Sequence, residues 1–284
     1  MKLGYNTNGL AHHEPLQALE MLAKIGYQSV AITIDHGWLA PQQKERDGQL
    51  QEIRNCLATH KMDCVVESGA RFLLDPCQKH FPTLLDPNPA LSSKRVEFLH
   101  YCLDTAVELE ADCVSIWSGK KPEGMEDQQA LDTLAENLGK VLEHAEQQNM
   151  AIGFEPEPEM FVDTMQGYER LLEWIDSPNL GLTLDIGHLF CMGELPIVDF
   201  IQRWRDRILN VHIEDMRAGI HEHLMFGDGE IYFPPILQSL IEIGYRGGLH
   251  VELSRHSHDA FNVARQSYDF LASTISELRS LPES

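Results

Sequence analysis

Eight short, mostly apolar runs recur along the chain, and each is separated from the next by enough residues to hold a helix. The runs cover residues 2–7, 29–34, 63–68, 112–117, 151–156, 180–185, 208–213 and 248–253. Several are almost continuously apolar and β-branched, as is typical of parallel strands that are buried on both faces. The repeat therefore predicts strands and helices that alternate around a parallel sheet.

The segments between these runs carry helical patterns. Residues 13–26 have one apolar stripe and end at Gly26, a suitable C-cap. Residues 127–148 repeat apolar side chains every three or four positions, and residues 233–245 begin with prolines, which a first helical turn tolerates. Each of these segments is expected to be a helix that leads back to the next strand.

Eight strand-helix units in 284 residues suit a TIM barrel, whose usual length is about 250 residues. An open doubly wound sheet is the alternative, but no G-x-G-x-x-G motif follows the first run. No linker or low-complexity segment divides the chain. We therefore expect an α/β fold, a (β/α)8 TIM barrel with outer helices, in which residues 1–284 form a single domain.

Acidic residues dominate the charge, with 44 Asp and Glu against 22 Lys and Arg and a formal net charge of −22. Such a surface repels phosphate backbones and anionic membranes, so neither nucleic acid nor a membrane is an expected partner. No run approaches the ~18 apolar residues of a membrane span. The first fifteen residues also lack the apolar stretch of a signal peptide.

The six cysteines form no C-x-x-C pair, and an even count in a chain of this length does not imply a disulfide framework. We expect a cytoplasmic protein with reduced, buried thiols. The sequence leaves the oligomeric state open, a homo-oligomer included.

Acidic residues and a histidine stand where the later runs end. The fifth run ends at Glu155, the sixth at Asp185 with His188 just after it, the seventh at His212 and the eighth at Glu252. In a TIM barrel these ends surround the active site. Alone, each side chain is most simply solvated or bonded to nearby backbone. Together they favour one bound divalent cation, which would offset the cost of burying several carboxylates.

Oxygen ligands with one imidazole suit Mg²⁺, Mn²⁺ or Co²⁺, and Zn²⁺ also binds such a set. The segments that carry these residues read "FEPEPE", "LTLDIGH", "LNVHIED", "FGDGEIYFPPIL" and "HVEL". In this order they resemble the xylose isomerase-like TIM barrel superfamily, most strongly over residues 151–253. That superfamily includes sugar and sugar-phosphate isomerases, ketose 3-epimerases, hydroxypyruvate isomerases, some dehydratases and zinc-dependent AP endonucleases.

The resemblance implies that Glu155, Asp185, His212 and Glu252 are the metal ligands and that His188 lies either against the substrate or just behind the ligands. It also implies that Glu155 and Glu252 exchange a carbon-bound proton from opposite faces of a sugar. Such chemistry is coherent, because a cation can stabilise the enediolate that forms when a proton leaves the carbon beside a carbonyl. A carboxylate on each side can then act as base or acid.

Further candidates for substrate contact follow the third, fourth, fifth and seventh runs. Arg71 can hold a carboxylate or phosphate, or else pair with Glu67. Trp117 can stack on a sugar face or serve only for packing. Glu157 either faces sugar hydroxyls or stiffens its loop, whereas Glu159 is expected to be solvated. By resemblance to ketose epimerases Arg217 contacts the substrate, although its spacing from His212 differs by about one; a surface Arg is the alternative.

Three histidines keep open roles at this stage. His36 follows the second run, and His221 and His223 lie in "AGIHEHLMFGDGE". The H-x-H spacing suggests zinc, because alternate residues of a strand share a face, but we expect an irregular loop here. We assign His223 to substrate contact.

We expect a divalent-metal-dependent isomerase or epimerase of a sugar, sugar phosphate or related keto-polyol. The alternative is a metal-dependent lyase or dehydratase of a keto-sugar or cyclitol, which would use the same cation and carboxylates. An AP endonuclease is disfavoured, because "VESGAR" and "IWSG" lack the extra histidines of those enzymes and the charge is acidic. A non-catalytic sugar-binding barrel would not need a complete set of ligands.

Overall fold

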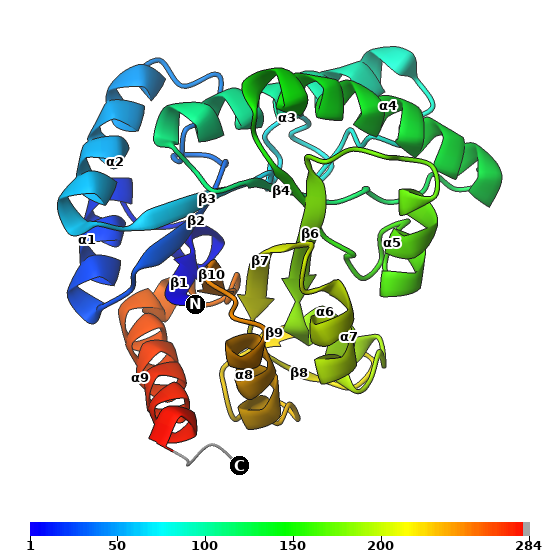
Figure 1. Ribbon diagram of the computed structural model, residues 1–284. Coiled ribbons are helices and arrows are strands. Elements are labelled where there is room, and N and C mark those ends of the chain that lie inside the picture. Colours follow the sequence, from blue (N-terminus) through cyan, green and yellow to red (C-terminus); the bar gives the residue numbers. More distant parts are fainter. Residues whose placement is uncertain (281–284) are drawn as a thin grey trace.

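Residues 1–280 are described by the computed structural model, in which parallel strands close into a barrel surrounded by helices (Figure 1). The strands follow the order β1-β10-β7-β6-β5-β4-β3-β2. Their bounds are β1 Lys2–Asn6, β2 Ser29–Thr33, β3 Asp63–Glu67, β4 Val114–Ile116, β5 Ile152–Phe154, β6 Leu180–Asp185, β7 Ile208–Ile213 and β10 Gly248–Val251. Each strand lies within one of the eight predicted runs, so the predicted (β/α)8 barrel is confirmed.

Helices lie along the outside of the barrel, where they connect successive strands, and α9 follows the last strand β10. They are α1 Pro15–Ile25, α2 Arg46–His60, α3 Pro89–Leu109, α4 Asp127–Gln148, α5 Met165–Leu172, α6 Ile186–Cys191, α7 Ile197–Trp204, α8 Phe233–Glu242 and α9 Ala260–Ser280, with short 3-10 helices η1 Thr7–Leu10 and η2 Ser257–Asp259. The helical pattern of residues 127–148 matches α4 in both bounds. α1 ends at Gly26, whose φ of 122° is one that side chains rarely adopt.

The connection after β7 is not the irregular loop that we expected from the sequence. It begins with a two-stranded antiparallel sheet of β8 Asp215–Arg217 and β9 Ile220–Leu224. Gly219, with a φ of 72°, lies in the turn between the two strands. His221 and His223 are therefore alternate residues of a strand and point to the same side of it.

The apolar core fills the space between the barrel and its helices. α1 contributes Leu19 and Leu22, which are both fully buried, and every residue of β2 and of β6 is buried as well. Complete burial of a Leu side chain contributes about 1.5–3 kcal/mol. The apolar periodicity of the sequence thus fixes which faces pack, and it leaves the ends of the strands free for polar residues.

The cysteines agree with the expectation only in part. All six are free, and Cys64, Cys102, Cys113 and Cys191 are buried, but Cys56 is half-buried and Cys77 is exposed. Within residues 1–280 no helix is long and apolar enough to cross a membrane. The expectation of one domain over residues 1–284 includes four residues outside the described part and stays a prediction.

Candidate metal centre and active site

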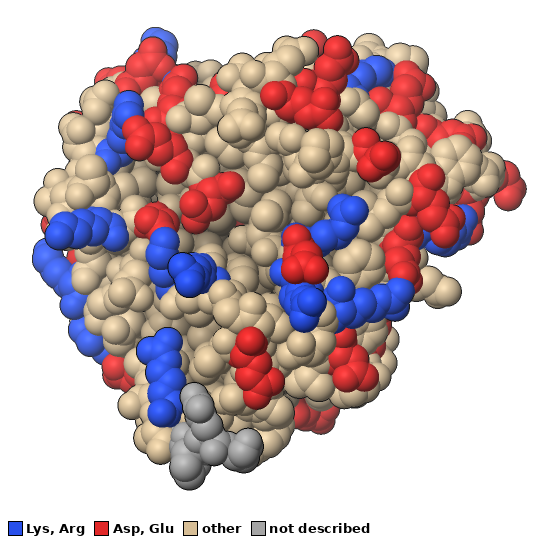
Figure 2. All heavy atoms as spheres, in the orientation of Figure 1, with Lys and Arg blue, Asp and Glu red and all other residues tan. Residues whose placement is uncertain are grey.

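A cavity of about 510 Å³ opens at the carboxyl ends of the barrel strands. Its floor includes Glu67, Glu155, His212 and Glu252, and its wall includes Trp117. Figure 2 shows Lys and Arg side chains among Asp and Glu around the middle of one face, so that face is not uniformly acidic despite the net charge of −22. The cavity lies where a TIM barrel holds its reacting groups.

The four predicted ligands meet here, and Glu155, His212 and Glu252 line the cavity. Glu155, Asp185, His212 and Glu252 come from the ends of four neighbouring strands, β5, β6, β7 and β10, and each offers one ligand atom within 4.8 Å of the others. The strand register places these residues at one level along the barrel axis, because Asp185 and His212 are paired directly across β6 and β7. Burial is nearly complete for Glu155, Asp185 and His212.

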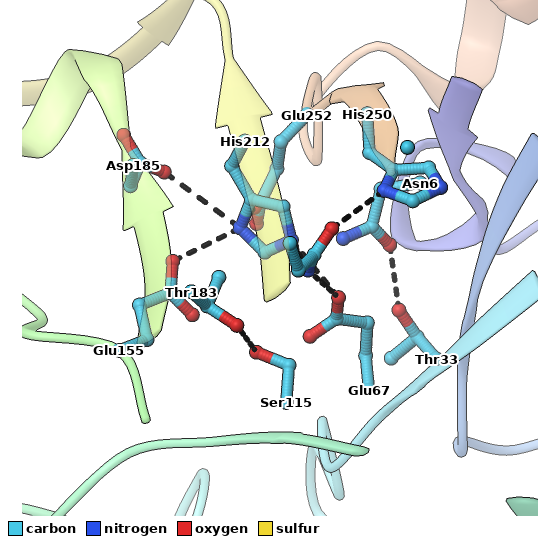
Figure 3. A network of polar contacts seen from close by, with 12 residues as sticks. Asn6, Thr33, Glu67, Ser115, Glu155, Thr183, Asp185, His212, His250 and Glu252 are labelled. Atoms are coloured by element: carbon cyan, nitrogen blue, oxygen red, sulfur yellow. Dashed lines mark hydrogen bonds and ion pairs between the residues drawn. The ribbon is translucent and has the colours of Figure 1, made fainter. Parts of the chain in front are cut away.

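His212 stands at the centre of the group, as Figure 3 shows. Its Nδ1 lies 2.9 Å from Glu155 Oε1, 2.9 Å from Glu252 Oε2 and 3.8 Å from Asp185 Oδ2. Asn8 donates from Nδ2 to Glu252 Oε1 over 2.7 Å and so fixes that carboxylate. Asp185 caps α6, because its Oδ1 accepts from the His188 backbone N–H over 2.8 Å.

The pKa shifts of Glu155 and Glu252 show that burial opposes the ionised carboxylates and that nearby positive charge stabilises them. Burial would lower the pKa of His212, but Glu155, Glu67 and Glu252 raise it well above its ordinary value. Burial raises the pKa of Glu155 to about 8, although His212 opposes the shift. Burial would also raise the pKa of Glu252, but the charge and hydrogen bond of His212 hold it well below its usual range.

The donor set fits a divalent cation. In the ionised form that binds metal, three carboxylates and one neutral imidazole carry a charge of about −3 in a nearly dry site, which is costly unless a cation compensates it. Asp185 Oδ2 has no hydrogen-bond partner although it is buried. Three oxygen ligands and one imidazole nitrogen suit Mg²⁺, Mn²⁺, Co²⁺ or Zn²⁺, and Glu155, Asp185, His212 and Glu252 would hold the ion.

His188 lies beside the four ligands, with Nε2 3.6 Å from Asp185 Oδ2 and Nδ1 3.7 Å from Glu155 Oε1. Both of its ring nitrogens lack a hydrogen-bond partner. β9 brings His221 and His223 to the same place, with ring centroids 4.9 Å and 6.0 Å from that of His188. Burial lowers the pKa of His188 and lowers that of His221 to about 4. His221 lines the cavity, whereas His188 is not among its lining residues.

The remaining predicted substrate contacts divide into two groups. Glu157, Trp117, Arg71 and His223 line the cavity, and His221 lines it too. Arg71 pairs with Asp35, its Nε lying 2.5 Å from Asp35 Oδ2, and not with Glu67 as the sequence allowed. All of these substrate roles stay predictions.

Arg217 and His36 lie elsewhere. The Arg217 side chain is 46% exposed, donates from Nη2 to the Asp228 carbonyl oxygen over 3.1 Å and lies 3.6 Å from Glu222 Oε2. It is not among the residues that line the cavity, whereas Arg255 is. His36 is exposed and also lies outside the lining. Glu159 is exposed, as expected from the sequence, and is one of the residues that line the cavity.

Sequence reasoning missed several polar side chains around the ligands. Glu67 accepts from His212 Nε2 over 2.9 Å, and Asn210 Nδ2 lies 3.1 Å from the same Glu67 oxygen. Glu214 is fully buried, and neither of its carboxylate oxygens has a hydrogen-bond partner. The alternation of Asn210 and His212 along β7, continued by Glu214 just after the strand, was an available signal, since every second residue of a barrel strand points inward.

The comparison with protein families gives one match over most of the chain. Residues 19–274 match the model of the xylose isomerase-like TIM barrel. The chain belongs to this family. The resemblance inferred from the strand-end motifs is thereby confirmed.

Relatives by sequence include an uncharacterised protein from Methanocaldococcus jannaschii, 33% identical over 178 residues that make up 59% of this chain and 61% of that protein. The inosose dehydratase of Lacticaseibacillus casei is 29% identical over 163 residues, or 51% of this chain and 54% of that enzyme. The chain thus spans about half to three fifths of the length of these two curated relatives.

Solved structures repeat the fold over nearly the whole chain. A D-tagatose 3-epimerase-like protein superposes with a TM-score of 0.82 at 22% identity and covers 98% of both chains. The IolI protein, solved with a bound zinc atom, gives 0.80 at 19% identity, with 99% of this chain and 100% of that chain covered. Identities this low establish the shared architecture only.

Proposed function

We propose that this protein is a divalent-cation-dependent isomerase or epimerase that moves a proton at a carbon next to a carbonyl in a sugar, sugar phosphate or related keto-polyol. The observation that carries the proposal is the placement of Glu155 and Glu252. Each carboxylate has an oxygen 2.9 Å from the same His212 nitrogen, yet they come from β5 and β10, at the two ends of the row of four ligand-bearing strands.

Two carboxylates that approach one point from different strands can serve one carbon from two sides. One takes the proton beside the carbonyl and the other returns a proton on the opposite face, as inversion requires. A bound divalent cation would supply positive charge for the oxygens that become negative in this step. The donor set of Glu155, Asp185, His212 and Glu252 and the zinc of the IolI structure support such a cation.

The histidine group supports a hydroxylated substrate. His188, His221 and His223 present nitrogens without hydrogen-bond partners, and a neutral imidazole can either donate to or accept from a hydroxyl group. Trp117 lines the same cavity and offers an aromatic face for the apolar side of a sugar ring. Glu157, 3.9 Å from His188 Nδ1, is a further acceptor for hydroxyl groups.

A dehydratase of a keto-sugar or cyclitol is the second candidate, because a sequence relative is an inosose dehydratase. The first step would be the same removal of a proton beside a carbonyl. The reactions then diverge: a dehydratase expels a hydroxyl group from the next carbon, whereas an epimerase returns the proton.

Proton exchange in D₂O separates the two reactions. The cation-loaded protein is incubated with a panel of ketoses, ketose phosphates and inososes, and each product is examined by NMR and mass spectrometry. An epimerase or isomerase puts one deuterium on carbon and keeps the formula otherwise unchanged, whereas a dehydratase product is lighter by one water. If no substrate of the panel exchanges a carbon-bound proton with any of the four cations, the proposal is wrong.

We also propose a cytoplasmic location and no nucleic-acid partner. The free thiols suit a reducing compartment, and the net charge of −22 opposes binding to phosphate backbones.

A further inference from the structure

A column of buried polar side chains runs inside the barrel beneath the ligand group. Ser29, Asn210 and His250 are fully buried, and Glu67 and His212 are nearly so. His250 Nε2 lies 2.9 Å from Ser29 Oγ, and His250 Nδ1 lies 2.7 Å from Asn210 Oδ1. Asn210 Nδ2 lies 3.1 Å from Glu67 Oε1, which is also 2.9 Å from His212 Nε2. Figure 3 shows Glu67, His212 and His250 from close by.

The barrel leaves room for this column by omitting two side chains. A Cβ at Gly4 would stand 2.3 Å from His250 Cδ2, and one at Gly248 would stand 2.1 Å from His250 Cε1. Neither distance is physically acceptable, so the His250 ring depends on glycine at both positions. The neighbouring strands therefore carry glycine where the His250 ring of the column needs space.

The chemistry of Glu67 determines where the protons lie. An ionised carboxylate only accepts hydrogen bonds, so the NH₂ end of Asn210 faces Glu67 and the carbonyl end faces His250. His250 must then carry its proton on Nδ1 and accept from the Ser29 hydroxyl through Nε2. Each member of the column thus has one donor-acceptor assignment.

The same reasoning applies to His212. If its Nε2 were a lone pair accepting from Asn210, 3.1 Å away, that lone pair would also face a Glu67 oxygen at 2.9 Å. Two acceptors at this distance repel. If Nε2 carries the proton, His212 and Asn210 are neighbouring donors that share the oxygen of Glu67. The nitrogen that would give up its proton to a bound cation is then Nδ1, which faces Glu155, Asp185 and Glu252.

We propose that Glu67 is a positioning residue, which holds the proton of His212 on Nε2 so that Nδ1 is free to bind the cation. Asn210, His250 and Ser29 support it by fixing the Glu67 carboxylate in place. The inference rests on the cation of the proposed function, but not on which reaction the enzyme catalyses. A carboxylate behind a metal-binding imidazole orients the ring and raises its basicity.

Paired substitutions at Glu67 test the inference. In Glu67→Leu the acceptor is gone, so Asn210 is expected to donate to His212 Nε2 and the proton of His212 moves to Nδ1, where it competes with the cation. Glu67→Gln keeps an acceptor oxygen. Zinc affinity, measured by competition with a chelating dye, is expected to fall about 10–100-fold in Glu67→Leu, the usual range for loss of such a partner. Glu67→Gln is expected to bind at least about tenfold more tightly than Glu67→Leu.

Two further variants separate the column from general damage to the barrel. Asn210→Leu should keep the Nε2 proton of His212 and weaken zinc binding less than Glu67→Leu does. Thr183→Val is the matched control, because it removes a buried bond of 2.9 Å to Ser115 inside the same barrel but outside the column. Its zinc affinity should stay within about twofold of wild type. If Asn210→Leu bound zinc as tightly as wild type, the proposed support of Glu67 by Asn210, His250 and Ser29 would be wrong.

Nitrogen-15 NMR of the histidine rings reads the proton positions directly. Zinc-loaded wild type and Glu67→Gln should show a proton on His212 Nε2, and His250 should be protonated on Nδ1. In cation-free protein the Nε2 proton of His212 should remain, so its absence from wild type overturns the inference even if no zinc binds. If wild type binds no divalent cation, the result contradicts the proposed function instead. Equal zinc affinity in Glu67→Leu and wild type contradicts the role of Glu67 alone.

Discussion

A divalent cation should stabilise this protein strongly, and replacement of Glu155 should remove most of that effect. The buried group holds three carboxylates around one imidazole, so the cation-free site carries uncompensated negative charge. A ligand at 100 times its dissociation constant stabilises the folded state by about 2.7 kcal/mol. Since about 1 kcal/mol moves the melting temperature of a chain of 150–250 residues by about 2–4 °C, we expect a rise of about 5–10 °C.

The size of the loss in Glu155→Gln follows from one charged contact. A hydrogen bond to a charged group contributes about 1.5–3 kcal/mol, and we use that range for one ligand contact. It corresponds to about 10–100-fold weaker binding. At the same cation concentration the stabilisation then falls to about 0.4–1.4 kcal/mol. The melting temperature should accordingly rise by only about 1–5 °C.

Glu159→Gln provides the control, because it makes the same substitution four residues away on an exposed side chain outside the ligand group. Differential scanning calorimetry of the three proteins, first with EDTA and then with excess Mn²⁺ or Zn²⁺, gives the measurement. Glu159→Gln should match wild type in its rise. A full rise in Glu155→Gln, or no rise in wild type, would refute the reasoning.

Three further outcomes follow from the same site. Burial raises the pKa of Glu155 from 4.5 to about 8, so between these pH values the folded protein holds a proton there that the unfolded chain releases. The unfolding free energy of cation-free protein should therefore fall as pH rises from about 4.5 to about 8. Urea titrations at several pH values measure this change. Glu155→Gln and Glu252→Gln, each loaded with metal, should lower turnover at least ~10²-fold, and near-full activity of either would show that its glutamate is not the base. His188→Ala should keep the metal and lose turnover; loss of the metal itself, measured by elemental analysis, would make His188 a ligand.

Much of this architecture could be predicted from the sequence because strand signals are local. The eight runs are apolar on both faces, and such runs occur where a parallel strand is covered on both sides. The level of the ligands along the barrel axis can also be predicted from where each strand ends in the sequence, since Glu155, Asp185 and Glu252 lie at or just after the last residue of their strands. In a barrel with fixed register, that position alone brings them to one level.

Contacts between loops and between distant strands could not be predicted in this way. The sequence offered Glu67 as a partner for Arg71, four residues away, but the structure pairs Arg71 with Asp35 and Glu67 with His212, 145 residues along the chain. Such pairs depend on the conformation of loops and on which side chain of a strand points inward. No pattern in a single sequence records these choices.

The sheet of β8 and β9 shows how a missed local signal changes the interpretation of function. Its strands are short and polar, so the apolar runs that identify barrel strands are absent, and only Gly219 and the alternation of His221 and His223 indicate a hairpin. Once β9 exists, both histidines face the same side and join His188 beside the ligand group. The cavity is thereby lined by carboxylates that favour a cation and by the imidazoles of His221 and His223, which can bind hydroxyl groups. This pairing of donor types is what directs the proposed function toward a carbohydrate and away from an apolar ligand.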